Sequence, residues 1–228
     1  VHMDNPNLVS ALDQCRKLLH KAETLSQEFK AQAYSVLRID DDVSEGITRT
    51  AREQNASLIL LGWSRRGFRA KLFGTLVDEV FWSSHCPVAV ARLLSEPTEI
   101  RRILVPMKTI TPQAVRTARF AQVFADTHHA TVTLLHVCDR HTRDDQVKAI
   151  ETALTKMMAD GPQISWNLLT TVGDSPAEVI LTTAQTHDMI VLRSMRRRTA
   201  GGLAVSDVTH RVIDEATCSL VLFGEPHT

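Results

Sequence analysis

Five basic residues are placed where they could bind an anion such as a phosphate or a cyclic dinucleotide. Four of them, Arg193, Arg196, Arg197 and Arg198, follow an apolar segment that ends at Leu192. The fifth, Lys108, follows the apolar segment 103–106. Planar guanidinium groups match the geometry of phosphate oxygens, so these residues are a candidate anion site. The alternatives are a solvated basic loop or an ion pair with the acidic run 40–42 of another subunit.

The histidines and serines form no catalytic or metal-binding pattern. His128 and His129 are expected to end a helix, and the other histidines have no second ligand at metal-site spacing. Ser206, Asp207 and His210 lie within about one helical turn, but no strained nucleophile turn accompanies them. We therefore expect no catalytic residue, no metal site and no enzyme.

The cysteines indicate a reducing compartment. They are far apart, they form no CxxC pair, and they lie in apolar or helical surroundings: Cys15, Cys86, Cys138 and Cys218. We expect reduced thiols in the core of a cytoplasmic protein.

Composition excludes several classes of protein. Lys and Arg number 26, as do Asp and Glu, so no global charge attracts nucleic acid or an anionic membrane. Apolar residues make up 43% of the chain, which is typical of a globular protein. The longest uncharged apolar stretches, such as 56–64 and 130–137, are far shorter than the ~18 residues of a membrane span. The length of 228 residues allows one large domain or two small ones.

Apolar periodicity predicts an α/β protein in which strands and helices alternate. Asp42 with Glu45, and Ser175 with Glu178, form capping-box patterns at two helix starts, and Thr111 can cap a third. Helices separating short apolar strands imply right-handed crossovers in a parallel sheet. The expected helices are 7–29, 42–54, 72–84, 111–125, 144–159, 175–186 and 207–216. The expected strands are 34–39, 58–61, 88–91, 103–106, 131–137, 164–169, 189–192 and 219–223.

The two halves of the chain resemble each other at a shift of about 132 residues. Segment 77–88 matches 209–220, and segment 60–62 matches 191–193. We predict a tandem duplication with domains at 4–95 and 99–225, joined by the linker 96–98. The first copy lacks the strand, helix and strand that open the second, so we expect one sheet of three strands and another of five.

Both copies resemble the universal stress protein family, most clearly from Gly62 to Val90. The resemblance implies tandem nucleotide-binding α-hydrolase-like domains, each a parallel sheet with helices on both faces, the first truncated at its N-terminus. In the family, one motif cradles the phosphates of ATP. It consists of a glycine, any two residues, a second glycine, any nine residues, and then a glycine followed by a serine or threonine. Glycines let backbone N–H groups approach phosphates, and a helix start favours an anion. In the first copy Gly62, Gly74 and Thr75 match, while the middle glycine falls near Ser64 or Arg65.

The second copy departs further from the family's motif. Arg193, Arg196, Ser206 and Asp207 stand at its four positions, and Lys108 replaces the aspartate that contacts the nucleoside. A carboxylate about 4 Å from a phosphate costs about 4 kcal/mol at an effective dielectric constant near 20, roughly a thousandfold in affinity. We therefore expect weak or absent ATP binding and no required cofactor, with ATP, AMP or a cyclic dinucleotide as possible ligands.

Three phrases, 60–64, 71–80 and 103–114, resemble the stress-protein tails of bacterial, notably cyanobacterial, sodium/proton antiporters of the cation/proton antiporter-2 family. The resemblance implies a cytoplasmic regulatory domain at the inner face of the cell membrane, with the parent's membrane domain as partner and no nucleic acid. The alternative is a stand-alone tandem stress protein that binds ATP. We also expect a homodimer, since strand 219–223 would otherwise leave an apolar sheet edge open to water.

Overall fold

The computed structural model describes residues 6–63, 74–138, 140–159, 166–194, 198–199, 202–203 and 205–226. The chain divides into two compact units, Val1–Gly46 and Ile47–Thr228. Each unit is described by itself. Within the described residues, no helix is both long enough and apolar enough to cross a membrane.

The first unit consists of one long helix, an irregular segment and the start of a second helix. Helix α1 (Pro6–Glu28) agrees with the predicted helix 7–29. Helix α2 (Val43–Glu53) begins where predicted, because the Asp42 Oδ1 atom accepts a hydrogen bond from the Glu45 N–H at 3.0 Å. Hydrogen bonds from the Ser44 hydroxyl and the Glu45 N–H lower the pKa of Asp42. The predicted strand 34–39 is wrong, since residues 31–40 have no regular secondary structure.

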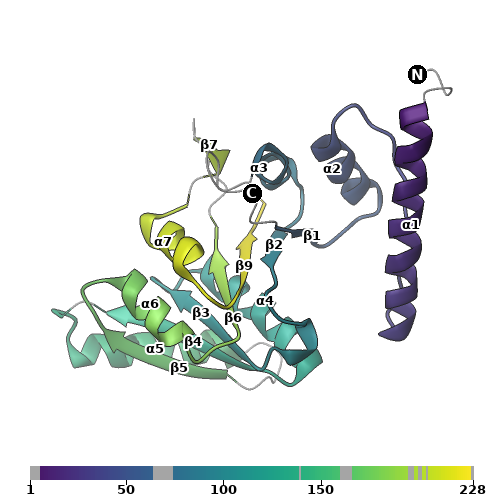
Figure 1. Ribbon diagram of the computed structural model, residues 1–228. Helices are drawn as coiled ribbons and strands as arrows, with labels where there is room; N and C mark the ends of the chain where they lie inside the picture. The colour runs from purple at the N-terminus through teal and green to yellow at the C-terminus, as the bar shows by residue number, and fades with distance from the viewer. Residues whose placement is uncertain are drawn as a thin grey trace. The chain divides into compact units, whose positions relative to one another are not determined.

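The second unit is built on one seven-stranded sheet (Figure 1), with strands in the order β1-β2-β9-β6-β3-β4-β5. All neighbouring strands are parallel except β2 and β9, which are antiparallel. The strands are β1 (Ile59–Gly62), β2 (Val88–Arg92), β3 (Arg102–Met107), β4 (Thr131–Cys138), β5 (Trp166–Val172), β6 (Met189–Arg193) and β9 (Ser219–Gly224). A short hairpin, β7 (Arg198–Thr199) and β8 (Gly202–Leu203), lies between β6 and the next helix and was not predicted.

The helices of the second unit agree with the sequence pattern to within a few residues. They are α3 (Gly74–Ser83), α4 (Pro112–His128), α5 (Asp144–Ala159), α6 (Pro176–Ala184) and α7 (Asp207–Glu215), and a 3-10 turn, η2 (Pro97–Glu99), occupies the predicted linker. The Thr111 hydroxyl caps α4 by accepting from the Ala114 N–H at 3.2 Å. Ser175 occupies the N-cap of α6 as expected, but its side chain makes no capping hydrogen bond, so that capping box is wrong.

The two copies share the single sheet, which corrects the expectation of separate sheets. Val90 of β2 lies opposite Leu222 of β9, and these residues are equivalent at the shift of 132. Ala89 lies opposite Phe223 and Ala91 opposite Val221, so the register is symmetric about the Val90–Leu222 pair. The strands therefore meet as in a two-fold interface, but within one chain. The expected apolar edge at strand 219–223 does not exist, because β2 covers it.

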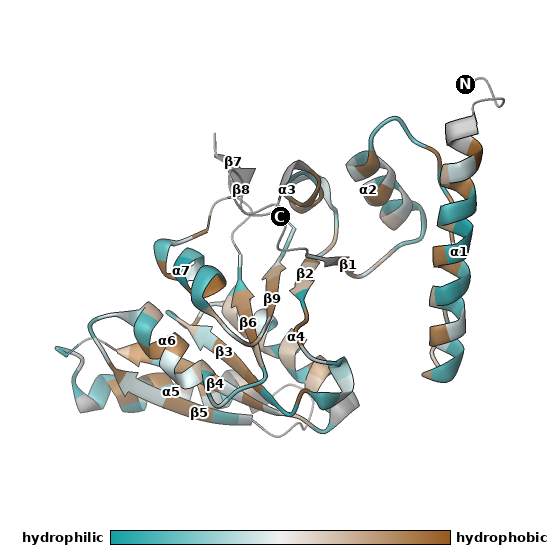
Figure 2. Cartoon of the chain, viewed as in Figure 1, coloured by the Kyte–Doolittle hydropathy of each residue, from teal (hydrophilic) through white to brown (hydrophobic). Residues whose placement is uncertain are grey.

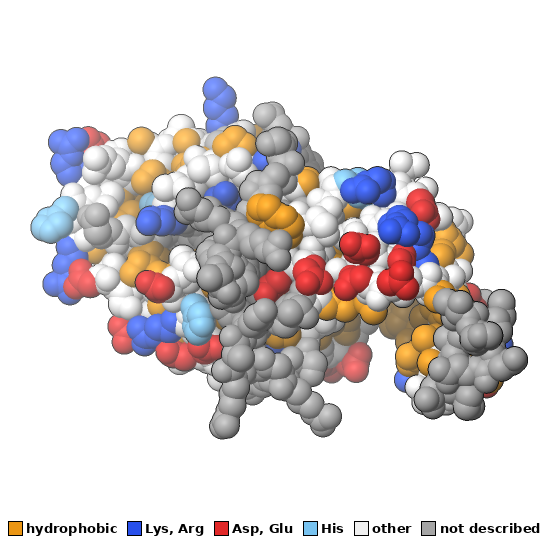
Figure 3. All heavy atoms as spheres, turned by 90° about the horizontal axis from the view of Figure 1, so that it is seen from above, with side chains coloured by type: hydrophobic (Ala, Val, Ile, Leu, Met, Phe, Trp, Pro, Cys, Tyr) orange, Lys and Arg blue, Asp and Glu red, His pale blue; other side chains and the backbone are white. Residues whose placement is uncertain are grey.

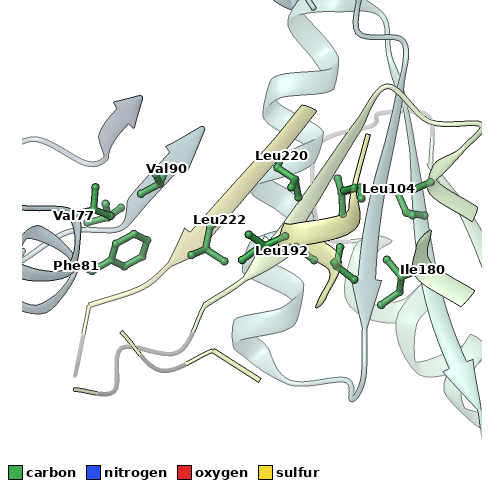
Figure 4. Packing of buried hydrophobic residues seen from close by; sticks show 14 of the residues in the cluster. Val77, Phe81, Val90, Leu104, Ile180, Leu192, Leu220 and Leu222 are labelled. Atoms are coloured by element: carbon green, nitrogen blue, oxygen red, sulfur yellow. The ribbon is translucent and has the colours of Figure 1, made fainter. Parts of the chain in front are cut away.

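The core lies on both faces of this sheet. One face packs against α3, α6 and α7, and Figure 4 shows Val77 and Phe81 of α3 near Val90 and Leu222 of the sheet. The other face packs against α4 and α5, with the small residues of α4 lying on the sheet: Ala114, Ala118, Ala121 and Ala125. The central strands are apolar along their length (Figure 2), as required of strands buried on both faces.

Candidate functional site

The carboxyl ends of β3 and β6 form the place where a ligand would bind in this fold. These parallel strands are neighbours, with Ile103 opposite Met189. The chain leaves β3 through α4 toward β4, and it leaves β6 through α7 toward β9 on the other side. The connections therefore diverge between β3 and β6, and such switch points bind ligands in open α/β sheets.

Two of the predicted anion-binding residues lie at these strand ends. Lys108 directly follows β3 and is exposed, and Arg193 ends β6 and is half-buried. The next residue, Ser194, is buried at 4% exposure and donates its N–H to the Phe223 carbonyl at 2.7 Å. Its Oγ atom has no hydrogen-bond partner among the described residues. Arg196 and Arg197 lie outside the described residues, and only the backbone of Arg198 is described.

At the start of α7, Ser206 supplies a hydrogen-bond acceptor and Asp207 supplies a negative charge. The Ser206 Oγ atom accepts from the Thr209 N–H at 3.1 Å, and Asp207 is the exposed first residue of the helix. A carboxylate there interacts favourably with the helix dipole and competes with a phosphate for it. Because Asp207 is exposed, its repulsion of a bound phosphate lies between about 1 kcal/mol in water and about 4 kcal/mol at a protein surface.

The first copy's candidate residues lie at the matching places. Gly62 ends β1 and Gly74 begins α3, followed by Thr75, while Arg65 lies outside the described residues. A Cβ atom at Gly62 would meet nothing within 4 Å, so its described surroundings do not require glycine. In the second copy, β3 lies beside β6 on the side away from β9. In the first copy, no described strand lies beside β1 on the equivalent side, away from β2.

Besides Ser194, sequence analysis missed a second buried polar group beside the carboxyl ends of β3 and β6. His136 of β4 is 8% exposed, and its Nδ1 atom lies 3.0 Å from the carbonyl oxygen of Met107. The ring thereby links the carboxyl ends of β3 and β4. The only available signal is one histidine within the apolar run 130–137.

The described residues contain no group of three or more His, Cys, Asp or Glu side chains that could hold a metal ion. His128 ends α4 as predicted, and His129 adopts the left-handed conformation after it, with φ of 53°. The described face in Figure 3 carries both signs of charge, in keeping with the equal numbers of acidic and basic residues.

The cysteines agree only in part with the expected core thiols. All four are free; Cys86 and Cys138 are buried and Cys218 is half-buried, but Cys15 is exposed on α1, so its expected core position is wrong. Burial raises the pKa of the Cys218 thiol, which lowers the fraction of the reactive thiolate.

The fold and the duplicated strand order define a class of protein, and comparison with known families identifies it. The model of the universal stress protein family matches residues 3–92 and 99–224, so the chain belongs to that family. Over its full length the chain is 46% identical to the Na(+)/H(+) antiporter NhaS5 of Synechocystis sp. (strain ATCC 27184 / PCC 6803 / Kazusa), and it spans 33% of that relative's length.

Two solved structures share the fold at low identity. A universal stress protein from Archaeoglobus fulgidus DSM 4304 has a TM-score of 0.65 and 16% identity, covering 97% of this chain and 83% of that one. A putative universal stress protein from Pseudomonas aeruginosa UCBPP-PA14 has a TM-score of 0.60 and 15% identity, covering 90% of this chain and 78% of that one.

Proposed function

We propose that the chain is a cytoplasmic regulatory module of a sodium (or other cation)/proton antiporter and that it catalyses no reaction of its own. The observation that carries the proposal is the 46% identity over the entire chain to part of an antiporter. The module would act on the membrane domain of its own polypeptide, at the cytoplasmic face of the membrane.

A transport assay tests this role. Everted vesicles containing the complete gene product should exchange Na⁺ for H⁺, and deletion of residues 4–228 should shift the half-saturating Na⁺ concentration or the pH dependence at least threefold. A complete product without exchange activity would contradict the antiporter assignment. An unchanged profile after deletion would contradict the regulatory role.

The nucleotide sites of the module are proposed to be degenerate. In the second copy Lys108 stands at the nucleoside position, Asp207 stands at the phosphate position, and Ser206 already caps its helix. These features disfavour the alternative of a stand-alone stress protein that works by binding ATP. ATP or AMP would bind, if anywhere, at the first copy's Gly62, Arg65, Gly74 and Thr75.

We expect no binding of Mg-ATP below about 1 mM in calorimetric titration at low ionic strength. Asp207→Thr, which places at α7 the residue type found at Thr75, should tighten ATP binding by a factor between about 5 and 1000, the range set by 1 to 4 kcal/mol. Asp145→Thr, in the first turn of α5, is the matched control and should have no effect. Micromolar affinity of the unmodified chain would contradict the prediction.

The arginines after β6 remain the candidate site for a different anion. If Arg193, Arg196 and Lys108 together bind an anion, a cyclic dinucleotide should raise the melting temperature of the chain by several degrees. The measurement is made at low ionic strength, where such contacts are strongest. Arg193→Ala with Arg196→Ala should abolish the rise, whereas Arg211→Ala should not. The absence of any rise would leave a solvated or docking loop.

The homodimer also remains a proposal, but it needs another interface. The strand that was expected to pair between chains already pairs within one.

A further inference from the structure

The outer edge of β1 has polar backbone groups and an apolar side chain without cover in the described part of the second unit. Ile59 and Trp63 donate their N–H groups to Pro87 and Ala91 of the β2 segment at 2.9 and 2.8 Å. Because backbone groups alternate in direction along a strand, the N–H of Leu60 points away from β2. The Leu60 side chain is 65% exposed.

The second copy shows what covers the equivalent edge. Ile59 lies opposite Val88 as Ile190 lies opposite Leu220, so β1 corresponds to β6 and Leu60 to Val191. Val191 is fully buried, with 0% exposure against 65% for Leu60. The same chain therefore provides a direct comparison between a covered and an uncovered copy of one position.

Two elements cover β6. On its edge β3 pairs in parallel, placing Ile103 and Leu104 opposite Met189 and Ile190. On its face, α4 lies in the same core cluster as Val191. Leu60 lies opposite Ala89, a member of that cluster, and so belongs to the same face of the sheet. The helical members of that cluster come from α4 and α5, and Leu60 is not among the partly buried residues packed against it.

We propose that the edge of β1 is the docking surface for a strand–helix–strand unit that precedes this sequence in the same polypeptide. Its first strand would pair in parallel with β1, as β3 pairs with β6. Its helix would cover Leu60 through a face of small residues, as α4 covers Val191. This inference does not depend on the proposed regulatory role.

The length of the two copies supports this occupant. The family model matches 90 residues of the first copy and 126 of the second, a difference of 36. The unit β3–α4–β4 spans residues 102–138, which is 37 residues. The antiporter relative is about three times as long as this chain, so a longer polypeptide has room for such a unit.

The irregular segment 34–39 supports the same occupant independently. At the shift of 132 it corresponds to 166–171, which lie in β5, and β5 pairs only with β4 in the described sheet. Three apolar residues of the segment are exposed: Val36, Leu37 and Ile39. The second strand of the proposed unit would pair with segment 34–39, as β4 pairs with β5.

Thiol labelling tests the proposal. Leu60→Cys would be made in a background with Cys15→Ser, both in the 228-residue chain and in the complete gene product, and its maleimide reaction rate measured. Val191→Cys is the buried control, and Val123→Cys, at a 61% exposed position of α4, is the exposed control. In the isolated chain the thiol introduced by Leu60→Cys should react as fast as the one introduced by Val123→Cys, and in the complete product at least tenfold more slowly.

Three outcomes would overturn the proposal. Equal rates in the isolated chain and the complete product would show that no preceding unit covers β1. Concentration-dependent protection in the isolated chain would assign the edge to a second copy instead. An upstream reading frame without a strand–helix–strand segment would also exclude it. None of these outcomes affects the transport assay, so the two proposals fail separately.

Discussion

Arg92→Met is expected to lower the free energy of unfolding by about 3 kcal/mol. Arg92 ends β2 in the first copy and is 5% exposed. Its Nη1 and Nη2 atoms donate to the carbonyl oxygens of Ile213 and Ala216 at 3.2 and 3.0 Å, at the end of α7 in the second copy. The guanidinium also lies 5.5 Å from the centre of the Trp63 ring.

The size of this effect follows from the location of the two carbonyl groups. The last carbonyls of a helix have no partner within the helix, and a cation there also interacts favourably with the helix dipole. Methionine fills similar volume but donates no hydrogen bond, so both acceptors lose a charged donor worth about 1.5 to 3 kcal/mol each before the arginine's own desolvation is recovered.

Urea denaturation at pH 7 measures the loss. Arg211→Met is the matched control: Arg211 is an exposed arginine on α7, paired with Glu215 at 2.8 Å, and its loss should change stability by less than about 0.5 kcal/mol. Arg92→Lys should recover only part of the loss, because the ammonium group keeps the positive charge but cannot donate to both carbonyl groups with the geometry of a guanidinium. A loss below 1 kcal/mol for Arg92→Met would show that the carbonyls find other partners.

Arg92 and the β2–β9 ladder show where sequence patterns stop predicting this fold. The seven strands of the main sheet are set by local apolar residues and were predicted to within a few residues, whereas the short strands β7 and β8 were not predicted. Which edge a strand pairs with depends on residues more than a hundred positions away. An apolar strand at 219–223 has the same pattern whether its partner lies in a second chain or in the first copy, so the pattern could not separate the two.

The segment 34–39 failed for a related reason. Its strand-forming residues predict an extended backbone, but a strand is stable only when a neighbour satisfies its hydrogen bonds. No strand of the described sheet pairs with this segment. The strand preference of these residues is therefore not enough to form a strand in the absence of a pairing strand.

The candidate site was predictable in position but not in detail. Lys108 follows β3, Arg193 ends β6, and Ser206 and Asp207 cap and begin α7. The strand order brings β3 and β6 together. The buried Ser194 and His136 depend on packing around those strand ends, which no local pattern encodes.

Asp188→Ala is the second substitution with a large expected effect, about 2 kcal/mol at pH 7. Asp188 precedes β6, and its Oδ2 atom accepts from the N–H groups of Arg101 and Arg102 at 2.9 and 2.8 Å, at the start of β3. Its Oδ1 atom lies 3.4 Å from the Arg102 guanidinium. The carboxylate thus joins the starts of two neighbouring strands through charge-assisted hydrogen bonds, each worth about 1.5 to 3 kcal/mol where water is excluded. The Asp188 side chain is 27% exposed, so water can replace part of these bonds and the net loss is smaller than their sum.

The stabilisation by Asp188 should depend on pH in a defined direction. Burial raises the pKa of this carboxyl group, but the backbone hydrogen bonds from Arg101 and Arg102 and the Arg102 charge outweigh it, so the folded pKa is lowered. A group whose pKa is lowered by folding contributes its full stability above its unfolded pKa of about 3.9 and loses it as the pH falls through the folded value. The difference between the unmodified chain and Asp188→Asn should therefore be constant from pH 7 to pH 5 and shrink below about pH 4.

Urea melts at pH 7, 5, 4 and 3 measure this profile. Asp174→Asn is the matched control, since Asp174 pairs with Arg140 at 2.6 Å but both side chains are more than 60% exposed. Such a surface pair should contribute less than about 1 kcal/mol at any pH. If the Asp188→Asn difference stayed the same down to pH 3, the charge of the carboxylate would not be the source of its stabilisation. The link between β3 and β6 would then rest on the sheet ladder alone.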